Sequence, residues 1–257
     1  MASEQDRKVI GNLQVDLVEH CGSSAQGQYL NTLTTTDINT GWWEGEAIMG
    51  RGEYASQQGL VQARARYPFA WVRLHSDNGA EFINWHLYRY TQKEKLDFSR
   101  SRPYKKNDNC LIEQKNWTHV KKFVGYLRYD TEEEQTLLND LYCHELRLYK
   151  NFFQPVIKLK EKMRIEGKIL RKYEPAMTPY ARVMASDTVS PETKKELRRL
   201  YDSLNPAELK RVIDGKLDKL YAAYQKKMRS PEIQPHKQTK PSSVTFLTAQ
   251  PEAVSVT

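Results

Sequence analysis

Three acidic residues, Asp16, Asp77 and Glu113, stand where carboxylates from separate elements can meet. Asp16 lies within an alternating apolar run, Asp77 directly follows a second apolar run, and Glu113 comes thirty-five intervening residues later. Mg²⁺ prefers oxygen ligands, and two such ions about 4 Å apart can activate the attacking oxygen and stabilise the leaving oxygen of a phosphodiester. The trio is therefore a candidate metal site. The chain contains 32 Asp and Glu, so three acids at this spacing could also lack any shared function.

The elements that would carry the first two acids follow a mixed α/β order. The run from Asn12 to Val18 alternates with period two, which places Leu13 and Val15 on one face of a strand and Asp16 on the other. In the adjacent aromatic pair Trp42-Trp43, we expect one core residue and one interface residue. The predicted elements are strands at 12–18, 29–37 and 41–48, a helix at 53–66, and a strand at 69–74 that ends before Asp77.

Helical patterns dominate the chain after Asp77. Asp77-Asn78-Gly79 supplies residue types that start a helix, and residues 80–95 carry apolar side chains near helical spacing. A short extended piece follows at 96–99. Residues 110–124 are predicted to form a helix with an imperfect apolar side, and Glu113 falls in its first turn. From such a helix a long Glu side chain can reach acids held on neighbouring strands.

The region beyond residue 130 is predicted to be mostly helical and basic. Thr131 and Glu134 have the spacing of a capping box, and Pro191 and Pro206 stand at first helical positions. The tail from Ser230 is rich in Pro, Ser and Thr and is predicted to be disordered.

The charge of the chain favours a polyanionic partner. The formal net charge is +8 and the sequence pI is about 9.2. Seven Lys or Arg accompany two Glu in 157–172, and four accompany no acid in 99–106. Charge alone does not separate nucleic acid from acidic lipid or simple solubility, and both stretches also fit solvated basic faces.

The composition argues against a membrane protein, a secreted protein and a zinc-binding protein. The longest apolar runs fall well short of the roughly 20 residues that span a bilayer, and the N-terminus lacks the apolar core of a secretion signal. Cys21, Cys110 and Cys143 are odd in number and lack zinc-site spacing, so we expect reduced thiols. The expected location is the cytoplasm, with no membrane partner and no small-molecule cofactor.

The motifs HSDNGAEF, around Asp77, and RPYKKNDNCLIEQKN, around Glu113, closely resemble the integrase core of retroviral integrases and bacterial insertion-sequence transposases, the Asp-Asp-Glu family. That family places its first Asp in the middle of the first strand, as in LQVDLVEH around Asp16. A gap of thirty-five residues between the second and third acids is also typical of the family. The resemblance covers roughly residues 10–125 and extends more loosely over 151–183. It implies a ribonuclease H-like fold, with a five-stranded mixed sheet flanked by helices and a mostly helical C-terminal region.

The resemblance also implies site residues. Asp16, Asp77 and Glu113 would be the catalytic ligands of two Mg²⁺ or Mn²⁺ ions. His75, on the strand face of Asp77, is expected either to orient a ligand or to be a packed strand histidine. Trp117 stands where those integrases often carry a DNA-contacting Lys, and we interpret it as a core or subunit-contact residue. The expected DNA contacts are Arg100, Arg102, Lys105, Lys106, Asn116, Lys121 and Lys122.

As a function, the resemblance implies a transposase or integrase, a polynucleotidyl transferase that cleaves DNA and transfers strands in the bacterial cytoplasm, at the nucleoid when bound to DNA. Its partners would be element ends, the target duplex and further copies of the chain. A metal-dependent nuclease of the same fold and a non-catalytic DNA-binding or regulatory protein are the alternatives. The expected domains are an N-terminal lead at 1–10, the catalytic core at 11–128, a basic helical region at 129–229 and a disordered tail at 230–257.

The short lead before the first strand shapes the expected mode of DNA binding. Insertion-sequence transposases of this type usually carry helix-turn-helix domains before the core, whereas about ten residues precede the first strand here. The expectation is a truncated or split copy, or one that takes end recognition from a partner. Its own DNA binding should then be weak and largely independent of sequence.

Overall fold

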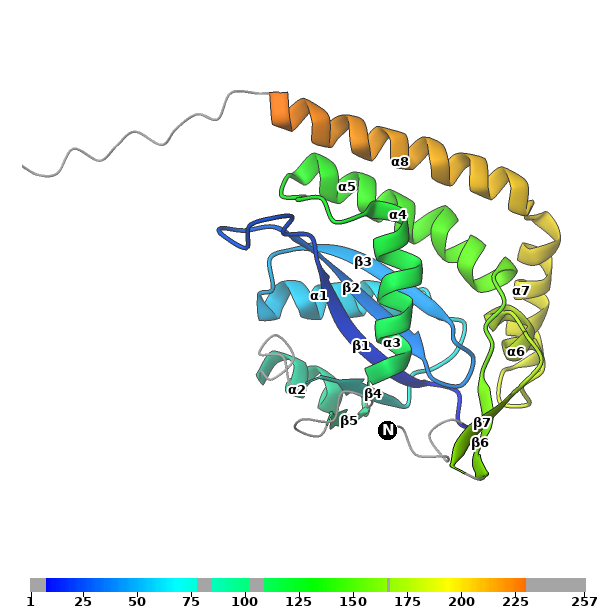
Figure 1. The fold of residues 1–257 in the computed structure, drawn as a ribbon. Helices are drawn as coiled ribbons and strands as arrows, with labels where there is room; N and C mark the ends of the chain where they lie inside the picture. Colours follow the sequence, from blue (N-terminus) through cyan, green and yellow to red (C-terminus); the bar gives the residue numbers. More distant parts are fainter. Residues whose placement is uncertain (1–7, 78–84, 102–108, 166, 230–257) are drawn as a thin grey trace, which may run out of the picture.

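A five-stranded sheet forms the centre of the molecule (Figure 1). The computed structural model describes residues 8–77, 85–101, 109–165 and 167–229. The strand order is β3-β2-β1-β4-β5; the first three strands pair antiparallel, whereas β4 is parallel to β1 and β5 is parallel to β4. This topology confirms the predicted ribonuclease H-like class. The strands are β1 (Asn12–Glu19), β2 (Leu30–Asp37), β3 (Trp43–Met49), β4 (Arg73–Ser76) and β5 (Asp97–Arg100).

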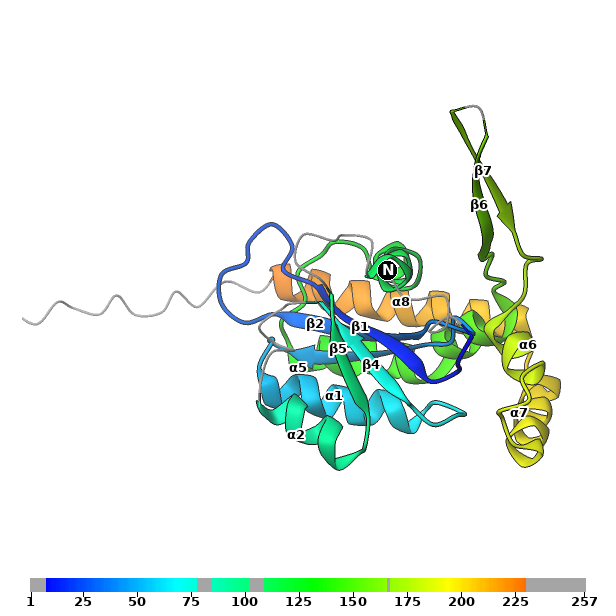
Figure 2. The same ribbon diagram turned by 90° about the horizontal axis from the view of Figure 1, so that it is seen from below.

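Two helices, α1 (Glu53–Ala65) and α2 (Trp85–Lys93), cover one face of the sheet (Figure 2). On α1 the buried side is made of small or aliphatic residues, which lets the helix approach the strands closely. At Gly59 an added Cβ would lie 3.1 Å from Ile48 Cγ2, tighter than ordinary contact, so this position favours glycine. The predicted helix at 53–66 is therefore present although it contains a glycine.

The opposite face is crossed by one continuous helical run, made of α3 (Cys110–Lys115), η2 (Asn116–Lys121) and α4 (Lys122–Val124). Its extent matches the prediction, but the central segment is π-helical. A π-helical turn contains more residues than an α-helical one and rotates the following side chains. This accounts for the imperfect apolar side, on which Val120 is fully buried whereas Trp117 is 48% exposed. Trp117 is therefore not a core residue, and the alternative of a subunit contact stays a prediction.

Most of the C-terminal region is helical, as predicted. Its first helix starts with the predicted capping box, in which Thr131 Oγ1 accepts a hydrogen bond from Glu134 N and Glu134 Oε2 accepts one from Thr131 N. The predicted tail lies outside the described residues. The helical elements are α5 (Glu132–Leu141), η3 (Tyr142–Leu146), η4 (Tyr149–Phe153), α6 (Pro179–Met184), α7 (Pro191–Ser203) and α8 (Pro206–Arg229).

The sheet separates two hydrophobic clusters, and the C-terminal helices contribute to both. Leu13 and Leu60 belong to the first cluster together with Tyr180 of α6, whereas Leu138 of α5 and Ile213 of α8 belong to the second. The sheet is thus packed on both faces.

The paired tryptophans illustrate this double packing. Trp42 lies in the first cluster and Trp43 in the second, each no more than 1% exposed. Successive strand side chains point to opposite faces, so a sheet packed on both sides buries both rings. The expected interface tryptophan is therefore a core residue.

One part of the C-terminal region differs from the helical expectation. Residues 159–173 form an antiparallel ribbon of β6 (Leu159–Ile165) and β7 (Lys168–Tyr173), which projects from the body of the molecule (Figure 2). Apolar and basic residues alternate over 162–165 of β6, and Gly167 supplies the positive φ of +81° in the connecting turn. This alternation of period two explains a ribbon in place of a helix.

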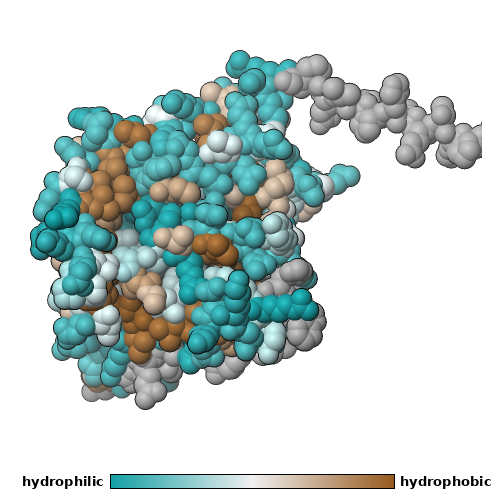
Figure 3. All heavy atoms as spheres, turned by 180° about the vertical axis from the view of Figure 1, so that it is seen from behind, coloured by the Kyte–Doolittle hydropathy of each residue, from teal (hydrophilic) through white to brown (hydrophobic). Residues whose placement is uncertain are grey.

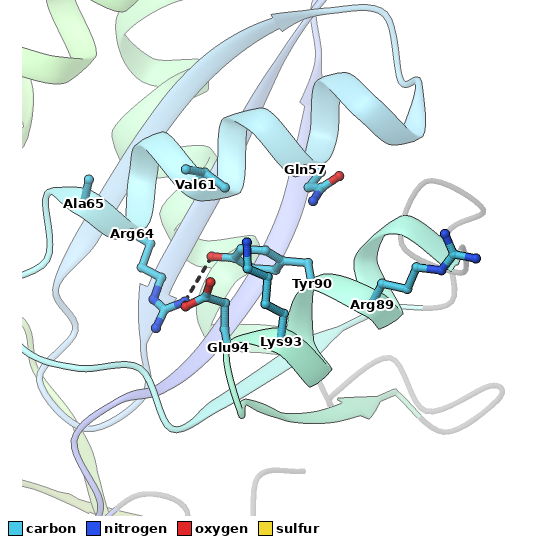
Figure 4. Close-up of a pocket in the computed structure, with 8 residues that line it drawn as sticks. All are labelled: Gln57, Val61, Arg64, Ala65, Arg89, Tyr90, Lys93 and Glu94. Carbon is cyan, nitrogen blue, oxygen red and sulfur yellow. Dashed lines mark hydrogen bonds and ion pairs between the residues drawn. The ribbon is translucent and has the colours of Figure 1, made fainter.

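The surface opposite α3 shows apolar patches within a mainly hydrophilic surround (Figure 3). A hollow of about 610 Å³ lies between α1 and α2 (Figure 4). Within it, Arg64 Nη1 donates to Tyr90 Oη at 3.2 Å and to Glu94 Oε2 at 2.8 Å, so this guanidinium is already engaged. None of the described helices is long and apolar enough to cross a membrane.

Candidate active site

The strand register places the first two acids side by side. Val15 of β1 lies opposite Ser76 of β4 in the parallel pair. Asp16 and Asp77 are the next residues of the two chains, so they lie at the same level, Asp16 within the sheet and Asp77 at the end of β4. Antiparallel pairing places Asp16 opposite Thr34 of β2 on its other side.

The third acid, Glu113, is positioned by a contact between α3 and β1. Ile112 N, in the first turn of α3, donates to the side-chain oxygen of Gln14 at 3.0 Å. The first N–H groups of a helix lack partners within the helix, and the N-cap residue Asn109 makes no side-chain cap bond. Gln14 therefore caps α3 from the strand, two residues before Asp16 and on the same face. Glu113, the residue after Ile112, is exposed.

Sequence reasoning missed the role of Gln14. The available signal was an amide that shares the strand face of Asp16. Gln14 is only 1% exposed, and a buried amide of this kind needs a hydrogen-bond partner.

The negative charges of Asp77 and Glu113 both act on the carboxylate of Asp16. Burial raises the pKa of Asp16 to about 7, and the negative charges of Asp77 and Glu113 both add to the rise. Hydrogen bonds to the carboxylate from Leu17 N (2.8 Å) and Asn116 Nδ2 (2.7 Å) act in the opposite direction. The three acids that the sequence singled out thus lie near enough to influence one another electrostatically, and their role as one catalytic site stays a prediction.

Asn116 orients the carboxylate of Asp16. Its Nδ2 donates to Asp16 Oδ2, while its Oδ1 accepts from Thr34 Oγ1 at 2.7 Å. The amide is fixed from both sides, and it stands at the first position of η2. The DNA contact expected of Asn116 stays a prediction, since in this structure its side chain holds Asp16.

The donor chemistry of the site fits a hard divalent cation. Three carboxylates from β1, the end of β4 and α3 supply the oxygen ligands that Mg²⁺ and Mn²⁺ accept. Burial is the main cause of the raised pKa of Asp16, and the charges of Asp77 and Glu113 add to it; a bound cation would relieve this unfavourable energy. Among the described residues, no three Asp, Glu, His or Cys side chains are already arranged as a metal cage.

The other expected DNA contacts divide into three groups. Arg100 and Lys122 are exposed. Lys121 is half-buried: its Nζ donates to Glu19 O at 2.6 Å and lies 4.8 Å from the ring centroid of Tyr126. The remaining members, Arg102, Lys105 and Lys106, lie outside the described residues. DNA contact stays a prediction for all of them.

His75 ties β4 to the segment of β5. Its Nδ1 lies 2.9 Å from Ser99 Oγ, and its Nε2 lies 3.3 Å from Ser101 Oγ. These bonds support the packed-histidine interpretation, and a ligand-orienting role for His75 stays a prediction.

At the level of the fold, solved structures with related architecture are retroviral integrase cores. The HTLV-2 integrase catalytic core domain in complex with magnesium, in its dimeric form, is 12% identical with a TM-score of 0.43, covering 58% of this chain and 92% of that one. The BIV integrase catalytic core domain is 15% identical with a TM-score of 0.40, covering 66% and 91%. No protein-family model matches the chain.

At the level of sequence, the chain is similar to the uncharacterized protein y4rM of Sinorhizobium fredii. The two are 38% identical over 172 residues, which make up 67% of this chain and 49% of that protein. The chain therefore spans about half the length of the curated relative it matches.

Proposed function

We propose that this chain is a polynucleotidyl transferase, a transposase or integrase of a bacterial insertion sequence that cleaves DNA and joins its strands. The observation that supports this proposal is that Asp16 and Asp77 lie at the same level of adjacent strands and that the charges of Asp77 and Glu113 both act on Asp16. Gathering carboxylates is unfavourable without a cation, so a purely structural role gives no reason for their proximity.

Asp16, Asp77 and Glu113 would together hold two Mg²⁺ or Mn²⁺ ions. When bound, the ions supply activation of the attacking oxygen and stabilisation of the leaving oxygen of a phosphodiester. Asn116 keeps the Asp16 carboxylate in one orientation, and Gln14 holds the first turn of α3 against β1. These two amides preorganise the acids, which reduces the rearrangement that substrate binding requires.

Positive side chains would bind the phosphates of the element ends and the target duplex. Arg100 and Lys122 are exposed and are suited to this role. Strand transfer must hold two DNA ends, so we expect the active form to be a homo-oligomer assembled on DNA.

The test compares purified wild type with Asp77→Asn on labelled duplexes in Mn²⁺, scoring nicked and joined products. Losing one charged ligand should abolish both products, while duplex affinity measured without catalysis stays equal or rises slightly, because a negative charge near the DNA is removed. Asp218→Asn on α8, an isosteric change at an exposed acid, is the matched control and should leave both products unchanged.

The products also distinguish the rival functions. Joined products from Asp77→Asn would overturn the proposed site. Nicking by wild type without joining would favour a simple metal-dependent nuclease, and binding without either product would favour a non-catalytic DNA-binding protein.

A further inference from the structure

The β6–β7 ribbon is an exposed arm. Every described residue from Lys160 to Tyr173 is exposed, and Leu159 at its base is half-buried. The ribbon projects on the side of the sheet that α3 crosses, the side on which Asp16 meets Asn116 (Figures 1 and 2). A two-stranded hairpin alone is only marginally stable in water, so an arm of this kind gains stability from a bound partner.

Pairing within the ribbon gathers bases on one face. Residues directly opposite each other in an antiparallel pair share a face, and successive pairs alternate. Lys162 pairs with Arg171 and Arg164 pairs with Ile169, so three of the four side chains on this face are cationic. The neighbouring pairs alternate with them and place Met163 and Ile165 on the other face.

The charges of the arm are available to an outside partner. Its two strands carry six Lys or Arg and one described acid, Glu161. Within the described residues, none of the six bases forms an ion pair, whereas near the body Arg128 pairs with Asp130 and Arg182 with Glu174. The six bases are Lys160, Lys162, Arg164, Lys168, Arg171 and Lys172.

We infer that the β6–β7 ribbon binds duplex DNA through the face of Lys162, Arg164 and Arg171. A two-stranded ribbon fits the major groove of a duplex, and its long cationic side chains reach the phosphates that border the groove. The choice of DNA as the polyanion rests on the proposed function. Bases also lie on the other face, where Lys168 pairs with Ile165 and Lys172 pairs with Glu161. A groove has phosphates on both sides of the ribbon, which favours it over a flat anionic membrane that would engage one face only.

The test uses the full chain with Lys162→Gln, Arg164→Gln and Arg171→Gln combined. Anisotropy of a labelled duplex is measured over a series of salt concentrations without a catalytic metal. We expect binding to weaken on the order of tenfold or more, and the slope of log affinity against log salt to fall by about 2 to 3, because three phosphate contacts are lost.

The matched control removes three exposed bases elsewhere, through Lys195→Gln, Arg199→Gln and Lys219→Gln on α7 and α8. It makes the same change in net charge and should shift affinity far less. A charge-keeping variant, with Lys162→Arg, Arg164→Lys and Arg171→Lys, should bind like wild type, which separates lost charge from a damaged ribbon.

Two results would overturn the proposal that the ribbon binds DNA. The first is equal duplex affinity of the Gln variant and the charge control. The second is a Gln variant that keeps its duplex affinity but no longer binds anionic vesicles. Nicking by wild type in Mn²⁺ is scored separately. If wild type never nicks but the ribbon variant binds DNA less tightly than the control, the DNA-binding role of the ribbon is supported and the proposed catalysis is not. If wild type nicks and the ribbon variant binds normally, the arm fails and the catalytic proposal stands.

Discussion

Asp16 shows how one residue depends on neighbours that are distant in sequence. Its carboxylate accepts bonds from Leu17 N and Asn116 Nδ2 while two like charges approach it. Thr34 holds the side-chain amide of Asn116, which in turn holds the carboxylate of Asp16. The chain Thr34, Asn116, Asp16 is therefore a positioning device, in which only Asp16 is proposed to touch a reacting group.

Replacing Asn116 with Leu should lower the rate of nicking by about 10- to 100-fold, the usual cost of losing a residue that orients a metal ligand. Raising the Mn²⁺ concentration should recover part of the rate, because the mispositioned carboxylate would bind metal more weakly. A fall in duplex affinity of the same variant would support the separate prediction that Asn116 contacts DNA. The measurements are nicking rates across a Mn²⁺ series and anisotropy with the same duplex.

Thr34→Val tests the same device one bond further away. It should move the nicking rate in the same direction by a smaller factor, since Asn116 keeps its bond to Asp16. An Asn116→Leu protein with wild-type nicking at low Mn²⁺ would show that Asn116 does not position Asp16.

At the scale of elements, Glu44 of β3 joins the sheet to two helices. It is fully buried and accepts hydrogen bonds from Trp42 Nε1 (2.9 Å), Arg66 Nε (3.1 Å) and Arg147 Nε (2.8 Å). Arg66 caps α1, and Arg147 lies in the helical run between η3 and η4. The carboxylate of Glu44 therefore connects β3 to the C-terminal end of α1 and to a helix of the C-terminal region.

Glu44→Ala should lower the free energy of unfolding by about 3 to 5 kcal/mol, because two mostly buried guanidinium groups lose their shared counter-charge. Urea unfolding followed by circular dichroism measures the change. Glu196→Ala, at an exposed acid on α7, is the control and should stay within about 0.5 kcal/mol of wild type. A loss for Glu44→Ala no larger than for the control would contradict the proposed role of this ion-pair network.

At the scale of the whole molecule, His20 links the sheet to the C-terminal helices. Its Nε2 lies 2.7 Å from Thr32 Oγ1, which in turn lies 3.0 Å from Tyr142 Oη, and its ring meets Tyr129 edge-on. Burial and, to a smaller extent, the positive charge of Lys121 lower the pKa of His20 to about 3. The folded protein thus requires a neutral imidazole at this junction.

Stability should therefore fall in acid. The pKa of His20 is about 6.5 when the chain unfolds and about 3 when it folds, so its contribution is complete above about pH 6.5 and is lost progressively as the pH falls toward 3. Between about pH 7 and 5, wild type should lose about 2 kcal/mol more than His20→Gln, which cannot titrate at this position. Urea unfolding at the two pH values measures the difference. His144→Gln, at an exposed histidine, should behave like wild type, and equal losses for wild type and His20→Gln would contradict the prediction.

Much of the fold could be predicted because its signals are local. Strand alternation around Asp16, the capping box at Thr131 and the prolines that open α7 and α8 each depend on a few consecutive residues. The ribbon was missed although Gly167 and the alternation over 162–165 are also local, because the region around this basic stretch is dominated by strong helix signals.

The order of the strands in the central part of the chain, the spacing of Asp16, Asp77 and Glu113, and the excess of positive charge could all be read from the sequence. The tertiary structure alone decided that Gln14 caps α3 and that Asn116 holds Asp16, contacts that span 98 and 100 residues of chain. Such contacts depend on the register of the π-helical run over β1, and no local pattern encodes that register. Whether three suitably spaced acids become one site is settled by packing between elements.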